Sequence, residues 1–286
     1  EEERDALADR LVDEISADYG NTILKSSARN EYMIQRTKRM VRRTVWAIQK
    51  QLKSGEFEPE GVEVVFQGGR IDRVDTMETD DGKLYVRVID YKTGNTSFDL
   101  VSLYHGLQLQ LMIYMDGALT VEQNKHKDKD VIPAGVFYYN IKDPMIQEKI
   151  DADVKAVSAG LMKELKMNGL VQADPELVYR MDSSLGSIPV AFNKDGSFRK
   201  NSSVADRTQF AVLGRYVRTK IEKIRSSILE GDAEVSPYEL GKKNACTYCP
   251  YMTVCGFDRR LSGYEFRRLK NFSDEELWKA FDREAE

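Results

Sequence analysis

The most restrictive feature of this sequence is a pair of strand-like runs separated by a short acidic turn. Residues 70–78 and 83–92 are both rich in β-branched and apolar side chains, and the Thr-Asp-Asp-Gly segment between them ends in an Asp-Gly pair. Such a pair between two runs of this kind is a strong hairpin signal, because glycine readily adopts the positive φ that tight hairpin turns need. The sequence therefore predicts an antiparallel hairpin over residues 70–92.

The register of this hairpin predicts which side chains meet. If the turn is centred near Asp81, cross-strand partners have residue numbers that sum to about 162, so Asp72 lies directly opposite Asp90. Lys92 projects from the same face as Asp90, because side chains alternate along a strand. Two facing carboxylates repel each other unless a cation lies between them, and hard oxygen ligands suit Mg²⁺. We therefore expect a magnesium site on the hairpin.

The apolar setting of the second run supports a site over an ordinary surface ion pair. Val86, Val88 and Ile89 lead into Asp90, so this strand is expected to be buried. A buried charge has to be paired or bind a metal, whereas exposed Asp and Lys residues commonly form weak salt bridges without function. A metal held here could activate a water molecule and stabilise charge on a phosphate, with Lys92 orienting the water or stabilising the transition state.

The rest of the pattern predicts a mixed sheet flanked by helices. Helical spacing extends over residues 1–20 and 27–51, a strand over 62–66, a helix over 100–119 with Asp99 as its N-cap, and a strand over 131–141. Further helices are expected at 151–167 and 204–230, with a polar hairpin at 188–199. The second helix carries basic residues that could contact phosphates or simply form a solvated face. They are Arg36, Lys38, Arg39, Arg42 and Arg43.

Three motifs resemble those of a known nuclease family. They are Gly-Arg-Ile-Asp-Arg-Val-Asp over residues 69–75, Val-Ile-Asp-Tyr-Lys-Thr-Gly over 88–94 and Gln-Leu-Met-Ile-Tyr over 110–114. In this order they resemble the consecutive motifs of RecB-family nucleases in the PD-(D/E)xK superfamily, most closely the nuclease domains of AddAB-type helicase–nucleases, from about Phe57 to Phe257. The resemblance implies a restriction-endonuclease-like α/β fold, a mixed sheet flanked by helices, with helical N- and C-terminal additions. We expect a helical segment over 1–56, the nuclease core over 57–245, and a cysteine cluster with the tail over 246–286.

The resemblance also implies roles for individual residues. Asp72 and Asp90 are then ligands of Mg²⁺ (or Mn²⁺), the backbone carbonyl of Tyr91 is another, and Lys92 is the catalytic lysine. Gln110 and Tyr114 come with the third motif and share one helix face, where they could hold the lysine or a DNA phosphate, or form a polar core pair.

Three neighbouring residues are expected to have other roles. By alternation Asp75 falls on the strand face opposite to Asp72 and is expected to form a salt bridge. His105 and Gln108, on the same predicted helix as the third motif, match it less well.

All cysteines of the chain lie in one short segment. Cys246, Cys249 and Cys255 form a C-x2-C-x5-C pattern, and the chain shows no secretion signal, which favours metal ligation in a reducing compartment such as the cytoplasm. In the family that the chain resembles, this triplet joins an upstream cysteine to bind a [4Fe–4S] cluster. A zinc site completed by His105 or His126 is the alternative.

Two family features have no counterpart in the sequence. The upstream cysteine is missing, and nothing in residues 1–60 matches the early Gly-x-x-x-His helix that contributes to the metal site. The chain begins at Glu1 within a helical pattern, so we expect a fragment in which both pieces were left out and the cluster is incomplete.

Three classes of function are disfavoured by the sequence. No apolar run is long enough to cross a bilayer, and no phosphate-binding G-x-x-x-x-G-K-[ST] loop indicates ATP hydrolysis. A net charge of −4 argues against a protein that coats DNA by charge alone.

The leading hypothesis is a Mg-dependent nuclease domain that cuts single-stranded DNA in double-strand break repair and recombination, with an AddA-type helicase–nuclease subunit as partner. The alternatives are an inactive nuclease fold for DNA binding or subunit docking, and a stand-alone RecB-like exonuclease.

Overall fold

The computed structural model describes residues 1–19, 23–147 and 153–285, and the chain folds into two compact units. The first unit comprises Glu1–Phe98 and Tyr114–Arg207, and the second comprises Asp99–Ile113 and Thr208–Glu286. Both units are discontinuous in sequence, because the chain leaves the first after residue 98 and returns at residue 114. The domain boundaries expected from the sequence at residues 56 and 245 stay a prediction.

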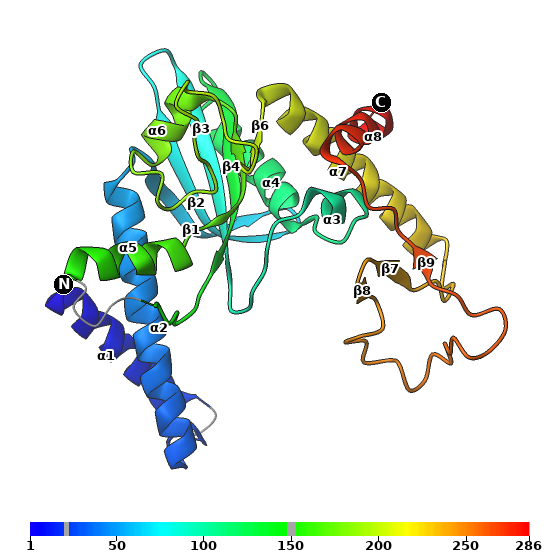
Figure 1. Ribbon diagram of the computed structural model, residues 1–286, viewed down its shortest axis with the longest axis horizontal. Helices are drawn as coiled ribbons and strands as arrows, with labels where there is room; N and C mark the ends of the chain where they lie inside the picture. The colour runs from blue at the N-terminus through cyan, green and yellow to red at the C-terminus, as the bar shows by residue number, and fades with distance from the viewer. Residues whose placement is uncertain (20–22, 148–152, 286) are drawn as a thin grey trace. The chain divides into compact units, whose positions relative to one another are not determined.

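The first unit is built on a six-stranded mixed sheet with the strand order β1-β2-β3-β4-β5-β6 (Figure 1). The strands are β1 (Glu58–Phe66), β2 (Gly69–Glu78), β3 (Lys83–Lys92), β4 (Asp130–Asn140), β5 (Asn168–Gln172) and β6 (Val204–Ala205). The first three form an antiparallel meander, β4 joins β3 in parallel, β5 is antiparallel to β4, and β6 is parallel to β5. The predicted fold class, a mixed sheet flanked by helices, is confirmed.

The β2–β3 hairpin has the register that the sequence predicts. Cross-strand pairs extend from Arg73↔Ile89 to Glu78↔Leu84, and the turn glycine, Gly82, has a φ of +78°. The hairpin therefore fixes two faces: even-numbered residues of both strands project to one side and odd-numbered residues to the other. The odd face lies on the main apolar core.

Helices pack on both faces of this sheet. The remaining helices of the first unit are α1 (Glu2–Asp18), α2 (Ala28–Lys53), α5 (Val154–Glu164) and α6 (Pro175–Met181). On the odd face, Ala47 of α2 and Leu177 of α6 share a core cluster with Ile89 and Phe137 of the sheet. On the even face, Tyr114 of α4 (Gln110–Lys125) lies near Tyr138, which pairs with Asp90, and the Tyr114 ring also meets that of Phe66 of β1 edge to face at 5.9 Å.

One predicted helix is wrong in its extent. The single helix expected over residues 100–119 is two helices, α3 (Leu100–Tyr104) and α4, because Gly106 between them adopts a φ of +78° that breaks the helical path. Asp99 does cap α3, where its carboxylate accepts hydrogen bonds from the Val101 and Ser102 amides. His105 and Gln108 consequently lie outside both helices, contrary to the expectation that they share one with Gln110.

Other sequence predictions were incomplete. Strand β5 and helix α6 were not foreseen, because each is short and has no strong periodicity. The helix expected over 151–167 is present as α5, and residues 151 and 152 lie outside the described residues.

The second unit is largely helical with an aromatic core. It contains α3, α7 (Arg207–Leu229), whose first residue still belongs to the first unit, α8 (Asp274–Ala285) and a small sheet of β7 (Tyr238–Leu240), β8 (Lys243–Asn244) and β9 (Arg267–Arg268). Tyr104 stacks on Tyr216 at 5.5 Å, and the Phe281 ring of α8 packs edge to face on both. Across the described parts of both units, no helix is long and apolar enough to span a bilayer.

Candidate active site

The hairpin brings Asp72, Asp90 and Lys92 together on its even face. The paired ladder ends at Arg73↔Ile89, so Asp72 and Asp90 occupy the next position at the end of the hairpin. Oδ2 of Asp72 accepts a hydrogen bond of 2.8 Å from the Tyr91 amide, which ties β2 to β3 at this point. Nζ of Lys92 lies 2.5 Å from Oδ2 of Asp90. The geometry is the one that the register argument predicted.

Asp90 is a charged group in an apolar strand. Its side chain is 3% exposed, whereas that of Lys92 is 27% exposed. Burial raises the pKa of Asp90 above its ordinary range, the Lys92 ammonium acts to lower it, and the neighbouring Asp72 raises it further. Folding therefore holds Asp90 in surroundings that disfavour its charge, as expected of a group whose partner is a cation.

The donor set at this position fits a divalent metal ion. Oδ2 of Asp90 is buried, and the partner that the described residues give it is the Lys92 ammonium. Over the same residues there is no group of three or more His, Cys, Asp or Glu side chains that could hold a metal. The protein ligands offered here are thus two carboxylates and main-chain oxygen, which suits Mg²⁺ because this ion usually keeps several of its waters.

The carbonyl of Tyr91 points to the same side as Asp72. Successive carbonyls along a strand point in alternate directions, and that of Lys92 accepts a hydrogen bond from Ile141, which follows β4. The carbonyl of Tyr91 must therefore point toward β2, as its own amide does. This orientation supports the expectation that the carbonyl is a metal ligand, which stays a prediction.

The sequence reasoning missed Tyr138, which completes the site from the neighbouring strand. Tyr138 on β4 pairs with Asp90 in the parallel register, and Nζ of Lys92 lies 5.4 Å from the centre of its ring. Burial, Asp90 and the nearby Tyr114 together raise the pKa of Tyr138 to about 12, so its hydroxyl stays protonated at neutral pH. The strand was predicted, but its parallel pairing with β3 depends on the crossover through α4 and cannot be inferred from local pattern.

Two asparagines hold the segment that follows Lys92. The amide of Thr96 donates to the side-chain oxygen of Asn140, and that of Phe98 donates to the side-chain oxygen of Asn168. Both asparagine side chains donate back to the carbonyl of Thr96. The backbone just beyond Lys92 is thereby fixed at the ends of β4 and β5, a contribution that no local sequence pattern indicates.

The third motif occupies the first two turns of α4. Tyr114 belongs to the first unit and packs on Phe66, while Gly117 lets the same ring approach so closely that a Cβ there would lie 2.5 Å from it. Gln110 is the first residue of α4 and belongs to the second unit. The predicted roles of Gln110 and Tyr114 at the reaction centre therefore stay predictions.

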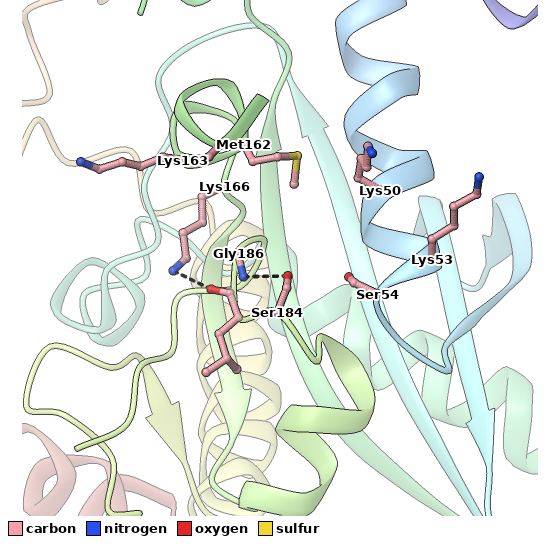
Figure 2. A pocket seen from close by; sticks show the side chains of 10 residues that line it. Lys50, Lys53, Ser54, Met162, Lys163, Lys166, Ser184 and Gly186 are labelled. Carbon is pink, nitrogen blue, oxygen red and sulfur yellow. Dashed lines mark hydrogen bonds between the residues drawn. The ribbon is translucent and has the colours of Figure 1, made fainter. Parts of the chain in front are cut away.

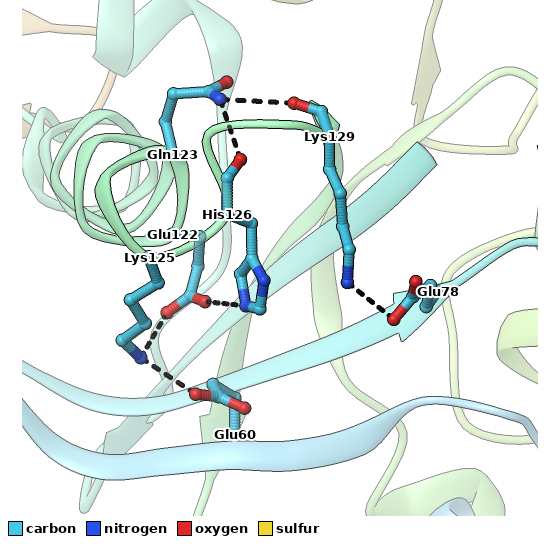
Figure 3. Close-up of polar contacts among 7 residues, drawn as sticks. All are labelled: Glu60, Glu78, Glu122, Gln123, Lys125, His126 and Lys129. Atoms are coloured by element: carbon cyan, nitrogen blue, oxygen red, sulfur yellow. Dashed lines mark hydrogen bonds and ion pairs between the residues drawn. The ribbon is translucent and has the colours of Figure 1, made fainter. Parts of the chain in front are cut away.

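The C-terminal end of α4 is fastened to the sheet by a charged cluster (Figure 3). Nζ of Lys125 lies 2.8 Å from Glu60 of β1 and 2.8 Å from Glu122, which is 1% exposed. Beyond the helix, Lys129 pairs with Glu78 of β2 at 2.7 Å. These contacts fix α4 against the first two strands, and with it the position of Tyr114.

A buried ionic network lies behind the site, on the odd face. Asp75 accepts two hydrogen bonds from Arg73, of 2.6 and 2.7 Å, and a third of 2.8 Å from Arg87. Arg73 also donates to the Tyr91 hydroxyl at 3.3 Å, and the Arg87 guanidinium lies over the Phe57 ring at 4.8 Å. The expectation that Asp75 forms a salt bridge is confirmed, and through Arg73 this network reaches the residue whose backbone faces Asp72.

The cysteine segment lies in the second unit. Cys246, Cys249 and Cys255 are free and partly exposed, and burial together with the other two thiols raises the pKa of Cys246. No metal-binding group of three such ligands is formed in the described residues, and the two histidines have other neighbours. Nε2 of His105 lies 2.8 Å from the Lys270 carbonyl, and that of His126 lies 3.7 Å from Glu122.

The basic face of α2 is largely neutralised within the chain. Lys38 pairs with Asp13 at 2.7 Å, Arg42 with Asp9 at 3.4 Å, and Arg39 and Arg43 with Asp143 at 3.3 and 2.5 Å. These partners favour a structural role over phosphate contact for this part of the helix.

Comparison with known proteins places these features in context. The sequence matches the model of the PD-(D/E)XK nuclease superfamily over residues 1–256. It is 40% identical, over its whole length, to a protein of Lachnoclostridium phytofermentans named as a subunit of an ATP-dependent helicase/deoxyribonuclease, and covers 26% of that protein. Proteins of the same name from Clostridium acetobutylicum and Alkaliphilus metalliredigens are 37% and 33% identical over 96% and 100% of the chain. The chain thus spans about a quarter of the length of the curated relatives it matches, 26% of two and 27% of the third.

Proposed function

Because this chain belongs to the PD-(D/E)XK nuclease superfamily, we propose that it is a Mg²⁺-dependent deoxyribonuclease domain that hydrolyses phosphodiester bonds in single-stranded DNA. The observation that carries the proposal is the meeting of Asp72, Asp90 and Lys92 at the end of one hairpin, with the Asp90 carboxylate buried and paired to the Lys92 ammonium. The same fold with Asp72, Asp90 and Lys92 far apart would not support this activity.

The residues of the site divide the chemistry among them. Asp72, Asp90 and the Tyr91 carbonyl would hold the ion, which when bound lowers the pKa of a water molecule and neutralises charge on the phosphate. Lys92 donates to the attacking water or to a phosphate oxygen and stabilises the charge that develops there. Asp90 and the Tyr138 ring hold the lysine in place from two sides.

The names of the relatives support a role for the domain within a larger protein. Each of the relatives described is named as a subunit of an ATP-dependent helicase/deoxyribonuclease. We infer that this domain cuts DNA in an AddAB-type helicase–nuclease with an AddA-type partner, in double-strand break repair and recombination. Unwinding and ATP hydrolysis are assigned to other parts of that assembly.

An iron–sulfur cluster is proposed for the parent protein. Cys246, Cys249 and Cys255 supply three thiolates, and a [4Fe–4S] cluster takes four. The residues present do not complete the cluster by themselves, so the fourth ligand is assigned to a part of the parent protein outside these 286 residues.

The test is cleavage of 5′-labelled linear single-stranded DNA. With Mg²⁺, the wild-type protein is expected to cut, whereas Asp90→Asn and Lys92→Gln lose about 10²-fold or more in rate, the size of effect seen when a transition-state donor is removed. EDTA should abolish cutting in all samples. Lys194→Gln, an exposed lysine of the first unit, is the matched control. Identical products from wild type and Asp90→Asn would overturn the proposal in favour of an inactive nuclease fold.

A further inference from the structure

The first unit contains a cavity with a basic lining (Figure 2). Its volume is about 620 Å³, and its walls come from the end of α2, from α5 and Lys166 just beyond it, and from the 184–186 loop. Its cations are Lys50, Lys53, Lys163 and Lys166. Among the described residues, no aspartate or glutamate contributes to the lining.

These lysines differ from the basic residues earlier on α2. Arg39, Arg42 and Arg43 each pair with an aspartate of the first unit. In contrast, no ion pair joins Lys50, Lys53, Lys163 or Lys166 to any carboxylate in the described parts of the chain. Their positive charge is therefore available to a ligand.

Lys166 is the cation best placed to gain from an anion. It is half-buried, and in Figure 2 it turns toward the 184–186 loop, where Nζ lies 3.5 Å from the Leu185 carbonyl. Burial lowers the pKa of Lys166, an effect that Asp182 offsets in part. A neutral carbonyl at that distance does little to compensate a desolvated ammonium, whereas a phosphate oxygen would.

The walls of the cavity are fixed by backbone contacts. The amide of Ser183 donates to the Ser54 carbonyl, and the Glu56 amide donates to the Arg180 carbonyl. Gly55 allows this approach, because a Cβ at that position would lie 2.2 Å from the Met181 carbonyl oxygen. The cavity is consequently preorganised, so a ligand would not have to order its walls on binding.

One buried aspartate, Asp182, fixes the 184–186 loop that forms one wall of the cavity. Asp182 is 0% exposed and accepts hydrogen bonds from the amides and hydroxyls of Ser184 and Ser187. Although burial acts to raise the pKa of Asp182, these hydrogen bonds lower it overall, so the carboxylate stays charged. Asp182 does not line the cavity, but its charge acts on Lys166 from the turn behind the lining.

The chemistry of the lining points to a nucleotide. Besides the lysines, Ala159, Met162 and Leu185 provide an apolar wall, and the volume lies within the roughly 300–1,000 Å³ of small-molecule sites. We propose that this cavity binds a nucleotidyl phosphate, with the phosphate on Lys166 and Lys50 and the base or sugar on the apolar wall. The source is a free nucleotide or a residue of a DNA strand.

This site is distinct from the proposed catalytic centre. Met162 and Leu185 pack on the core cluster that contains Ile89, on the odd face of the sheet. Asp90, the next residue, projects from the even face. Binding in the cavity therefore does not require the nuclease activity, and the inference goes beyond the proposed function.

Binding to the full chain in EDTA tests the proposal. The probes are thymidine 5′-monophosphate, inorganic phosphate and a short oligothymidylate, measured by calorimetry. Thymidine 5′-monophosphate is expected to bind with a Kd of about 1 mM or lower, and Lys50→Gln/Lys166→Gln to weaken it at least about tenfold. The variant should fold normally, because Lys50 is exposed and the ammonium of Lys166 is already disfavoured by burial; circular dichroism checks this.

The control variants make each outcome decisive. Lys194→Gln/Lys200→Gln removes two exposed lysines outside the cavity and should bind like wild type. If Lys50→Gln/Lys166→Gln weakens binding of the oligothymidylate as much as binding of thymidine 5′-monophosphate, the ligand is a residue of a DNA strand. If only binding of the mononucleotide is weakened, the ligand is a free nucleotide. Absence of saturable binding to wild type, or the same weakening in the control pair, would overturn the proposal.

Discussion

At the scale of single residues, the main feature of the site is Asp90, a carboxylate that the fold buries in surroundings that disfavour its charge. Asp90 is 2% exposed and its pKa is raised by burial and then by Asp72, while Lys92 opposes the shift. A buried charge of this kind lowers the stability of the folded protein and is typical of functional sites.

The first prediction concerns the stability of the metal-free protein. Because the folded-state pKa of Asp90 is raised, its stabilising contribution is present below its unfolded pKa of about 3.9 and is lost as the pH rises through the folded value. Asp90→Asn mimics the protonated state, so in EDTA at pH 7 its thermal midpoint should exceed that of wild type by a few degrees. Lys92, which is 27% exposed, can be hydrated in the variant.

The difference in midpoint should shrink as the pH falls toward 3.9 and should be reversed by Mg²⁺, which stabilises wild type alone. A variant that is less stable than wild type at pH 7 in EDTA would contradict this account of Asp90.

Tyr138 provides the second prediction, at the same scale. Its ring lies 5.4 Å from Nζ of Lys92, whereas its hydroxyl, whose pKa is raised to about 12, stays protonated at neutral pH and does not act as a base. Tyr138→Phe should therefore keep most of the cleavage rate, and Tyr138→Leu should lower it by about fivefold or more, in line with a cation–π contact of ~1 kcal/mol or more. Equal rates for Phe and Leu would show that the ring does not position the lysine.

At the scale of elements, the hairpin shows how much of the site the sequence could predict. Register and alternation were sufficient to place Asp72, Asp90 and Lys92 on one face and Asp75 on the other, because both follow from local geometry. Tyr138 could not be found in this way, since its position depends on how a distant strand joins the sheet.

The helix break at Gly106 was missed for a different physical reason. Glycine is tolerated inside helices, so an isolated one does not predict an interruption. Its positive φ, which ends the path of α3 before α4 begins, is visible only in the folded chain.

The third prediction tests the ionic network that supports the hairpin. Asp75 is 0% exposed and receives hydrogen bonds from Arg73 and Arg87, so Asp75→Ala leaves two buried guanidinium groups without their carboxylate partner. We expect a loss of about 3–5 kcal/mol in the free energy of unfolding, measured with urea. Thr76→Ala on the same strand is the matched control, with a loss below about 1 kcal/mol. A similar small loss for Asp75→Ala would show that the network does not stabilise the hairpin.

At the scale of the whole molecule, the division into units does not follow the order of the sequence. Residues 99–113 leave the first unit and contribute α3 to the second, where Tyr104 packs on Tyr216 and Phe281. Domain boundaries predicted from sequence assume that each domain is one continuous segment. The assignment of residues 99–113 to the second unit could therefore not be inferred from the sequence pattern.

The fourth prediction follows from the place of residues 99–113 in the second unit. A chain that ends at residue 207 keeps α3 but loses its partners in α7 and α8, so Leu103 and Tyr104, 0% and 9% exposed in the folded chain, would be open to solvent. We expect residues 1–207 to aggregate or to bind a hydrophobic dye strongly, whereas residues 1–286 do not. A monomeric and cooperatively folding 1–207 chain would contradict the prediction.

The most direct test of the central claim is the binding of Mn²⁺ to the metal-free chain, followed by electron paramagnetic resonance. The account predicts that wild type binds the ion, that Asp72→Asn and Asp90→Asn weaken binding at least about tenfold, and that Lys92→Gln and Cys246→Ser bind as tightly as wild type or more tightly. Equal binding by wild type, Asp72→Asn and Asp90→Asn, or a loss confined to Cys246→Ser, would show that the hairpin is not the metal site.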